Sequence, residues 1–266
     1  MPTPPLPGFL RAPRSFFAAP VLELAPRLLG GVLRRDGPEG AVAVRITEVE
    51  AYGGGHDPGA HSFRGRTARN ATMFGPPGHL YCYFTYGMHH ALNVVCHSEG
   101  VATGVLLRAG EVVVGEEAAR ARREAFRAER AAARLRRSPG AAAPSRAIPF
   151  RELARGPGNL AGVFGATRAD DGADLAGEEW SWWLPHEGLG LAERGIEERG
   201  AAGDRRFELG EAPALPEGMR QGPRVGVAGP GGDAEAFPWR FWLDGEPSVS
   251  AYRPAVKRRR GGASAS

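Results

Sequence analysis

One segment of strictly alternating polarity constrains the fold more than any other part of the sequence. Residues 41–52 read AVAVRITEVEAY. One parity begins with three β-branched apolar residues: Val42, Val44 and Ile46. This period of two predicts a β-strand with one buried face. The same parity continues to Glu48, Glu50 and Tyr52, so we expect two carboxylates and a phenol to point the same way as the core residues.

The other elements that the sequence predicts are short. Residues 79–97 read as two β-rich runs joined at Tyr86-Gly87-Met88, which predicts a hairpin. Further strands are predicted at 103–109 and within 238–250, and helices within three ranges: 21–29, 114–137 and 152–165. Because no βαβ order appears, the predicted class is α+β, with a curved, mainly antiparallel sheet, surrounding helices and a protruding β-hairpin.

The length of 266 residues with 42% hydrophobic positions suffices for one folded domain. We expect a flexible, proline-rich lead-in over 1–14, a domain over 15–255 that includes an arginine-rich helical segment and loop at 114–150, and a disordered basic tail over 256–266. No run of about 18 apolar residues and no signal-like leader occurs. With two cysteines that match no disulfide framework, we expect a cytoplasmic or otherwise intracellular protein.

The positive charge is unevenly distributed. The net charge is +4, and the tail run Lys257-Arg258-Arg259-Arg260 alone carries that much. Residues 116–146 hold nine arginines against four glutamates, whereas residues 58–98 contain no Asp or Glu. That acid-free window holds three arginines that are candidates for nucleic-acid backbone contacts: Arg64, Arg66 and Arg69. Net charge alone is weak evidence for such a partner.

Two common kinds of site find little support. Six of the seven histidines lie within 56–97, but they lack the paired spacing of structural zinc ligands, so no metal site is predicted. Gly156, Gly158 and Gly162 do not have dinucleotide-binding spacing, and no strand precedes them.

The carboxylates at the end of the 41–52 strand are better candidates for chemistry. Burial raises the pKa of a carboxyl group and makes it a useful base near neutral pH. The alternative is a structural ion pair of Glu48 or Glu50 with Arg45, Arg64 or Arg108, and the local pattern leaves both interpretations open.

Four of the five tyrosines lie between residues 52 and 86. Tyr81 and Tyr83 share one face of their strand, and sheet packing is the favoured interpretation for Tyr81. Tyr86 lies at the predicted hairpin turn beside the acid-free window. An aromatic side chain there could insert between bases, although ordinary packing is an equally good explanation.

Several motifs together resemble one enzyme family. They are RITEVEAY, AHSFRGRTARNATMFGPPGHLYCYFTYGMHHALNVVC, GVLLRA, ELARGPGNL, PRVGV and PWRF. In this order and spacing they resemble the alkyladenine (3-methyladenine) DNA glycosylases over about residues 15 to 252. The sequence departs from the family at Asn159, where a lysine is common, and in the long arginine-rich stretch at 116–146.

The resemblance implies a catalytic set. Glu50 would be the general base that deprotonates a water attacking C1′ of the damaged nucleotide. Arg108 would help to hold this water, and the backbone carbonyl of Val225 would complete the clamp.

The resemblance also implies a base pocket and a wedge. The flipped base would be sandwiched by Tyr52 and His61 on one face and by Tyr83 on the other. Asn93 would crowd the 2-amino group of normal guanine. Tyr86, with its neighbour Met88, would enter the duplex from the minor groove and fill the gap left by the base.

The implied activity is excision of alkylated or deaminated purines from double-stranded DNA by a monomer that needs no metal or organic cofactor. Glycosylases that also cut the strand commonly use a lysine amine. The only lysine here is Lys257 in the tail, and Pro2 lies in a flexible setting, so we expect a monofunctional enzyme that leaves an abasic site. The alternatives are a catalytically silent protein that binds distorted DNA through the hairpin, and an acyl- or formyl-transferring enzyme, for which we find no nucleophile or cofactor cradle.

Overall fold

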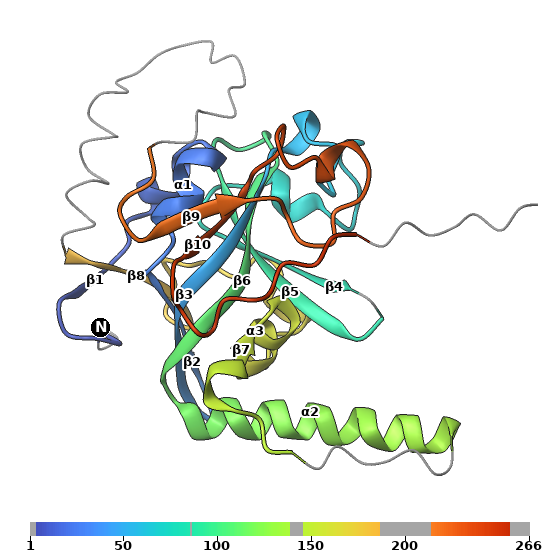
Figure 1. Ribbon diagram of the computed structural model, residues 1–266. Helices are drawn as coiled ribbons and strands as arrows, with labels where there is room; N and C mark the ends of the chain where they lie inside the picture. Colours follow the sequence, from blue (N-terminus) through green and yellow to red (C-terminus); the bar gives the residue numbers. More distant parts are fainter. Residues whose placement is uncertain (1–3, 86, 139–145, 187–213, 256–266) are drawn as a thin grey trace, which may run out of the picture.

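The computed structural model describes residues 4–85, 87–138, 146–186 and 214–255. Its central feature is a sheet in which every pairing is antiparallel. The main path of the sheet runs β1-β8-β2-β3-β6-β5-β4, with β10 and β7 added beside β3 and β6. The predicted α+β class is therefore confirmed (Figure 1).

The strands that carry the site are the long central pair and the hairpin beside it. They are β3 (Gly40–Tyr52), β6 (Thr103–Val114), β4 (Leu80–Thr85) and β5 (His89–Cys96). The remaining strands are β1 (Phe9–Arg11), β2 (Val32–Gly37), β7 (Ala154–Arg155), β8 (Trp180–Pro185), β9 (Met219–Gly222) and β10 (Arg240–Leu243). The predicted strand at 41–52 and the hairpin at 79–97 are confirmed, whereas only a short part of 238–250 is a strand.

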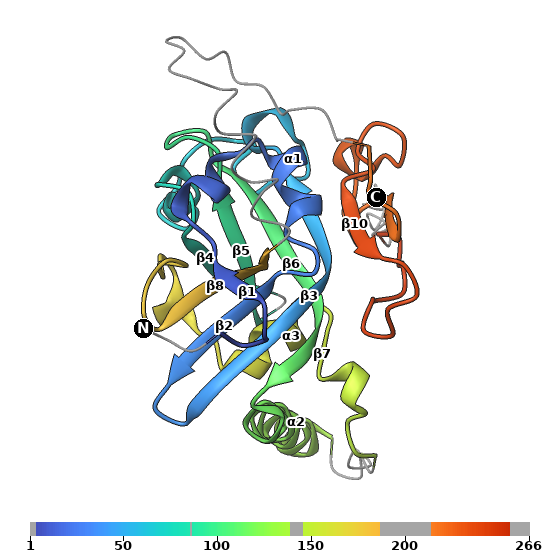
Figure 2. The same cartoon turned by 90° about the vertical axis from the view of Figure 1, so that its left-hand side faces the viewer.

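Three α-helices lie in the described part of the chain: α1 (Val21–Arg27), α2 (Glu116–Arg137) and α3 (Pro157–Phe164). α1 and α3 contribute apolar side chains to the main core, where they pack on β3, β5 and β6. α2 buries only Ala119. In both views α2 lies at the end of the sheet opposite α1, and in Figure 2 the segment with β9 and β10 stands to one side of β3.

The predicted orientation of Glu48, Glu50 and Tyr52 is wrong, and the reason is a β-bulge. Ile46 pairs with Gly110 and Glu48 pairs with Ala109, so Thr47 is an extra residue on β3. A bulge residue reverses the alternation that follows it. Val49 and Ala51 consequently join the core with Val42, Val44 and Ile46, and the two glutamates and Tyr52 face the other side of the sheet.

The opposite face is buried by the C-terminal segment. β10 pairs with β3 so that Phe241 lies beside Val49 in the core and Arg240 lies beside Glu50. Thr47 is fully buried and its hydroxyl lies 2.9 Å from that of Ser248. Glu50 is thus buried as expected, although beneath residues 224–250 and not in the main core.

Candidate active site

A second bulge aims Arg108 at the two glutamates. Glu48 pairs with Ala109 and Val49 pairs with Leu107, which leaves Arg108 as the extra residue on β6. Leu107 points into the core with Val49. Arg108 points to the opposite face, where its side chain is only 7% exposed. Bulges often redirect side chains at functional sites in this way, and here two of them bring one cation and two carboxylates together.

Four hydrogen bonds hold the carboxylate of Glu48. Its Oε1 accepts hydrogen bonds from Arg108 Nε at 2.8 Å, Arg240 Nε at 2.7 Å and the hydroxyl of Ser250 at 2.9 Å. Its Oε2 accepts one from the backbone N–H of Ser250 at 2.8 Å. Two of the four donors are arginine side chains, and two belong to Ser250 of the C-terminal segment. Glu48 is therefore an anchor for the C-terminal segment.

The ionisation of Glu48 agrees with that role. Burial acts to raise the pKa of its carboxyl group, but the charges of Arg108 and Arg240 and the Ser250 N–H bond outweigh it, so the pKa is lowered. A carboxylate whose pKa is lowered is a poor proton acceptor. Of the two candidates for a base, Glu48 therefore matches the structural ion-pair alternative.

Glu50 has one fewer donor. Its Oε1 accepts a 2.6 Å hydrogen bond from the backbone N–H of Val225 and lies 3.2 Å from Nη1 of Arg108. Its Oε2 accepts a 2.9 Å bond from the hydroxyl of Tyr52. Three donors leave about one lone-pair position on Oε2. Glu50 is therefore a buried carboxylate that can still accept a proton from a water. The contact of Val225 is through its N–H, and the role of its carbonyl stays a prediction.

Tyr52 is held in its neutral form beside Glu50. Burial and the neighbouring carboxylate raise the pKa of Tyr52 well above its ordinary value, so its hydroxyl keeps the proton that it donates. One face of the ring lies 4.5 Å from the guanidinium of Arg224. Arg224 is paired with Asp57 at 2.5 and 2.7 Å, and both side chains have no exposed surface. This buried pair fixes the chain immediately before Val225.

The sheet register aligns the base with the predicted pocket. Glu50 pairs with Leu106, Leu106 pairs with Asn93, and Asn93 pairs with Tyr81. Residues that pair directly across strands have side chains on the same face. Adjacent strands lie about 4.8 Å apart, so Asn93 lies roughly 10 Å from Glu50 along this row. Asn93 is buried, and its side-chain amide lies 3.4 Å from the carbonyl of Tyr81.

The aromatic residues form a different arrangement from the one expected. The rings of His61 and Tyr83 touch edge to face with centroids 4.6 Å apart, and Tyr81 stacks on Tyr83 at 5.1 Å. His61 and Tyr83 are thus in direct contact, with no space for a base between their rings. The sandwich itself stays a prediction. The predicted shared strand face of Tyr81 and Tyr83 is confirmed.

The titration of His61 favours a neutral ring. His61 is exposed on one side, but its ring is partly desolvated by the side chains around it. This desolvation lowers the pKa of His61, and the charge of Arg69 lowers it further. A neutral imidazole has one N–H donor and one acceptor nitrogen. His61 can therefore offer a donor to a purine without adding positive charge.

The three arginines of the acid-free window are all exposed. Arg69 donates a 3.0 Å hydrogen bond to the carbonyl of Phe84, and its guanidinium lies 5.8 Å from the ring of Tyr83. The guanidinium of Arg66 lies 6.0 Å from the ring of Phe74. DNA contact by Arg64, Arg66 and Arg69 stays a prediction.

The predicted wedge lies partly outside the described residues, because Tyr86 is not among them. Its neighbours are described: Met88 donates its backbone N–H to the carbonyl of Thr85 at 3.1 Å, which closes the turn. Gly87 has φ +65°, a left-handed conformation that favours glycine. The hairpin is braced by α2 next to its turn, where the rings of His89 and Phe126 lie 5.1 Å apart.

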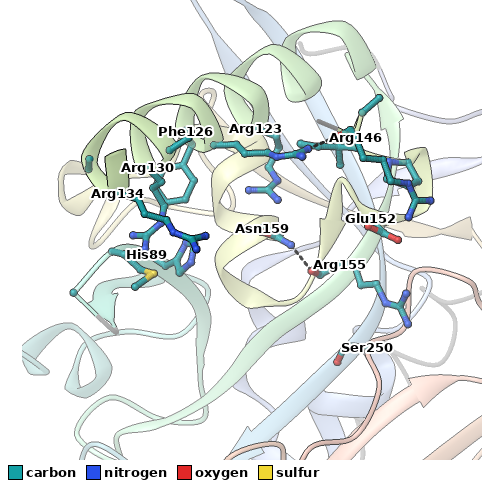
Figure 3. Close-up of a pocket in the computed structure, with 18 of the residues that line it drawn as sticks. His89, Arg123, Phe126, Arg130, Arg134, Arg146, Glu152, Arg155, Asn159 and Ser250 are labelled. Atoms are coloured by element: carbon teal, nitrogen blue, oxygen red, sulfur yellow. Dashed lines mark hydrogen bonds between the residues drawn. The ribbon is translucent and has the colours of Figure 1, made fainter. Parts of the chain in front are cut away.

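A groove connects this hairpin with the partners of Glu50. It has a volume of about 1540 Å³ and is lined by Met88 and His89, by α2, by residues 146–155, and by Arg108, Val225 and residues 250–253. Nine arginines line it, and Glu152 is its one acidic residue. Figure 3 shows several of these arginines around the opening together with His89, Phe126 and Ser250. The groove is thus strongly positive and reaches two of the three partners of Glu50.

Other kinds of site are not evident in the described residues. They contain no group of three or more His, Cys, Asp and Glu side chains that could hold a metal ion. Cys82 and Cys96 are buried free thiols, and burial raises the pKa of each to about 12. Within the same residues, no helix has the length and apolarity needed to span a membrane.

The sequence analysis missed the residues that distinguish the two glutamates. Arg240 and Ser250, which occupy Glu48, and Arg224 and Asp57, which position the backbone next to Glu50, were not singled out. Arg224 and Arg240 do stand within PRVGV and PWRF. The position of each arginine inside a motif that carries the family resemblance was therefore the available signal.

Comparison with known proteins gives the family. A family model described as methylpurine-DNA glycosylase (MPG) matches residues 15–247. The chain is 48% identical over 241 residues to a protein of Leifsonia xyli, with 90% of this chain and 92% of that protein covered. It is 45% identical over 247 residues to a protein of Streptomyces avermitilis, with 93% and 94% covered. Both relatives are named "Putative 3-methyladenine DNA glycosylase". Because these matches span nearly the whole folded region, the chain belongs to the methylpurine-DNA glycosylase family.

Proposed function

We propose that this protein removes alkylated and deaminated purines from double-stranded DNA by hydrolysing the N-glycosidic bond with a water activated by Glu50. The family supports the coarser statement that the protein is a DNA glycosylase, a hydrolase of N-glycosyl bonds. The observation that carries the finer proposal is the contrast between two buried carboxylates, because Glu48 accepts four hydrogen bonds and Glu50 has only three donors.

The reaction follows from that contrast. A water at the open position of Glu50 would transfer a proton to the carboxylate while its oxygen forms a bond with C1′ of the nucleotide. The C1′–N bond breaks, and its electron pair leaves with the purine. A purine alkylated at N3 or N7 carries a positive charge and departs as a neutral molecule, so no acid is needed to protonate it. A neutral purine such as hypoxanthine departs as an anion and takes up a proton from water. Arg108 and the N–H of Val225 would hold Glu50 in place during this step.

The pocket supports recognition of a base that has left the duplex. The purine would stack on Tyr52 on one side and on Tyr83 with His61 on the other, a grouping that the 4.6 Å contact between His61 and Tyr83 favours. A cationic base between tyrosines gains about 0.5 to 2 kcal/mol from cation–π attraction. Asn93, in the same row as Glu50, would crowd the 2-amino group of guanine. Extrusion costs a few kcal/mol, which the wedge residues Tyr86 and Met88 would offset.

The abasic site would remain uncut. The single lysine of the chain is Lys257, so a lysine Schiff base with C1′ would require that residue. We propose a monofunctional glycosylase that acts as a monomer on duplex DNA inside the cell and uses neither metal nor organic cofactor.

The test is incubation of the protein with methylated duplex DNA and with a duplex that carries hypoxanthine. We expect free methylated purine and free hypoxanthine, alkali-labile sites in the DNA, and no covalent adduct after borohydride reduction. Binding to these duplexes without release of any base would instead identify a silent protein that recognises distorted DNA. A borohydride-trapped adduct would contradict the monofunctional assignment alone.

A further inference from the structure

The groove side of α2 carries a row of arginines with helical spacing. Steps of four, three, four and three residues separate them, which places all of them on one side of a helix. We call this row the arginine stripe, and its members are Arg123, Arg127, Arg130, Arg134 and Arg137. All five line the groove. The four glutamates of α2 do not line it, so the two signs of charge are separated around the helix axis.

Two arginines of α2 outside the stripe, Arg120 and Arg122, serve the fold. Arg120 donates to the carbonyl of Ile148 at 2.6 Å and pairs with Glu116. Arg122 donates to the carbonyl of Val163 at 3.1 Å and pairs with Glu39. In the part of the chain that the structure describes, no carboxylate forms an ion pair with any member of the stripe. Two members of the stripe also donate to backbone carbonyls, Arg123 to that of Leu153 at 3.0 Å and Arg127 to that of Arg146, but a carbonyl does not cancel their charge. The stripe therefore presents positive charge to the groove.

Folding alone does not explain the length of α2. Only Ala119 is buried, and the helix continues for about five turns beyond its first turn, with residues 123–137 contributing to the groove lining. A helix usually gains its stability from an apolar face packed against the core. Arg134, Leu135 and Arg137 are exposed instead. The distal half of α2 is thus an exposed surface in the part of the chain that the structure describes.

The groove continues from the stripe to the hairpin. His89 follows the predicted wedge directly and contacts Phe126 on the same helix as the stripe. In Figure 3, His89 lies next to Arg130 and Arg134. A duplex engaged by the hairpin tip would therefore extend along α2.

From these observations we infer that the arginine stripe binds the phosphates of undamaged duplex DNA on one side of the damaged base, so that α2 tracks the DNA backbone. From Arg123 to Arg137 the stripe rises by 14 residue steps, or about 21 Å along the helix. This length corresponds to the axial rise of roughly six base pairs of DNA. The identification of the damaged duplex as the substrate rests on the proposed function, but the binding of duplex phosphates by α2 does not.

Two neighbouring arginines give a matched test. Arg134 and Arg136 are both exposed and lie two residues apart on α2, but only Arg134 lines the groove. The experiment measures the affinity of wild type, Arg134→Ala and Arg136→Ala for an undamaged 24-base-pair duplex over a series of NaCl concentrations. Each phosphate contact contributes about 0.9 to the slope of log K against log [NaCl]. We expect Arg134→Ala to reduce this slope by about one and Arg136→Ala to leave it near the wild-type value.

A second variant separates local binding from overall charge. The triple variant Arg127→Ala, Arg130→Ala, Arg134→Ala should reduce the slope by about three, with unchanged helix content by circular dichroism. Equal slopes for Arg134→Ala and Arg136→Ala would overturn the inference, because general electrostatic attraction would then account for binding. The readout requires no base excision. A protein that releases no purine but shows the slope difference would refute the proposed function and leave the stripe assignment standing.

Discussion

Two glutamates on one strand acquire different chemistry from residues far away in the sequence. Glu48 and Glu50 are both fully buried on the same face. Arg240 and Ser250 occupy Glu48, whereas Glu50 receives a single backbone bond from Val225. No local pattern around residues 48–50 could distinguish them, because the deciding contacts come from about 175 to 202 positions later in the chain.

The pair of Asp57 and Arg224 should be important for stability. Both side chains are completely buried, and Arg224 also donates to the carbonyl of Ala51 at 2.9 Å. Replacing Asp57 with Asn leaves a buried guanidinium without its counter-charge, which costs about 3 to 5 kcal/mol. Asp244→Asn is the matched control, because its pair with Arg220 is more than half exposed and is worth at most about 1 kcal/mol. Urea unfolding of the two variants measures the difference, and similar midpoints would refute a structural role for the buried pair.

The buried carboxylate of Glu48 should make the stability of the protein sensitive to acid. Its pKa in the folded protein is below the ordinary value of 4.5, so its ionised form stabilises the fold above about pH 4.5. This contribution is lost as the pH falls through the folded-state pKa, because the protonated group no longer attracts Arg108 and Arg240. The free energy of unfolding of wild type should fall between pH 5 and pH 3 more steeply than that of Glu48→Gln. Parallel curves for the two proteins would contradict this assignment.

At the scale of the elements, the strands and hairpin could be predicted, but the bulges could not. The alternation over 41–52 correctly predicts β3, and the turn chemistry at Tyr86-Gly87-Met88 correctly predicts β4 and β5. The extra residues Thr47 and Arg108 are visible only in the pairing of β3 with β6. One extra residue exchanges the two faces of a strand. The strand was therefore predicted correctly, but the side of the sheet that Glu50 faces was not.

The packing of α3 against the hairpin can be tested with a pair of glycines. A Cβ at Gly158 would lie 2.7 Å from Cγ of His89, at the base of the predicted wedge. Gly158→Ala should therefore displace the hairpin and weaken the preference for a hypoxanthine duplex over an undamaged one. Gly162→Ala on the same helix is the control, because its nearest contact would be an ordinary 3.4 Å to Arg123. Its preference should match wild type, and its stability should rise by up to about 1 kcal/mol. Equal preferences in the two variants would show that the packing of α3 against His89 does not position the wedge.

At the scale of the whole molecule, the site forms where the two halves of the chain meet on the sheet. The N-terminal half provides Glu50, Tyr52 and the hairpin, whereas residues 224–253 contact the first two and complete the groove. Nine arginines line this groove, a local concentration of positive charge that the net charge of +4 does not reveal. The sequence identified the arginine-rich segment at 116–146, but its five groove-facing members could be recognised only after α2 was placed beside the hairpin.

The basic tail lies outside the described residues, and its sequence supports a prediction of its own. Residues 257–260 carry a charge equal to the net charge of the chain. Deletion of 257–266 should reduce the salt dependence of non-specific DNA binding. Single-turnover excision at saturating enzyme should be unchanged, because the deletion removes none of the residues assigned to the pocket. Loss of that excision rate would show that the tail takes part in the reaction.

The central claim is that Glu50 is the general base. The single-turnover excision rate of the Glu50→Gln variant tests this claim most directly. The measurement compares wild type, Glu50→Gln and Glu111→Gln at enzyme concentrations that saturate a hypoxanthine duplex. Glu111→Gln is the control, since it removes a carboxylate from the adjacent strand that pairs with Arg45 and not with Arg108. Removal of a general base costs about 10²- to 10⁴-fold. We predict a loss of this size for Glu50→Gln with DNA affinity retained, and a wild-type rate for Glu111→Gln. A wild-type excision rate in Glu50→Gln would contradict the account.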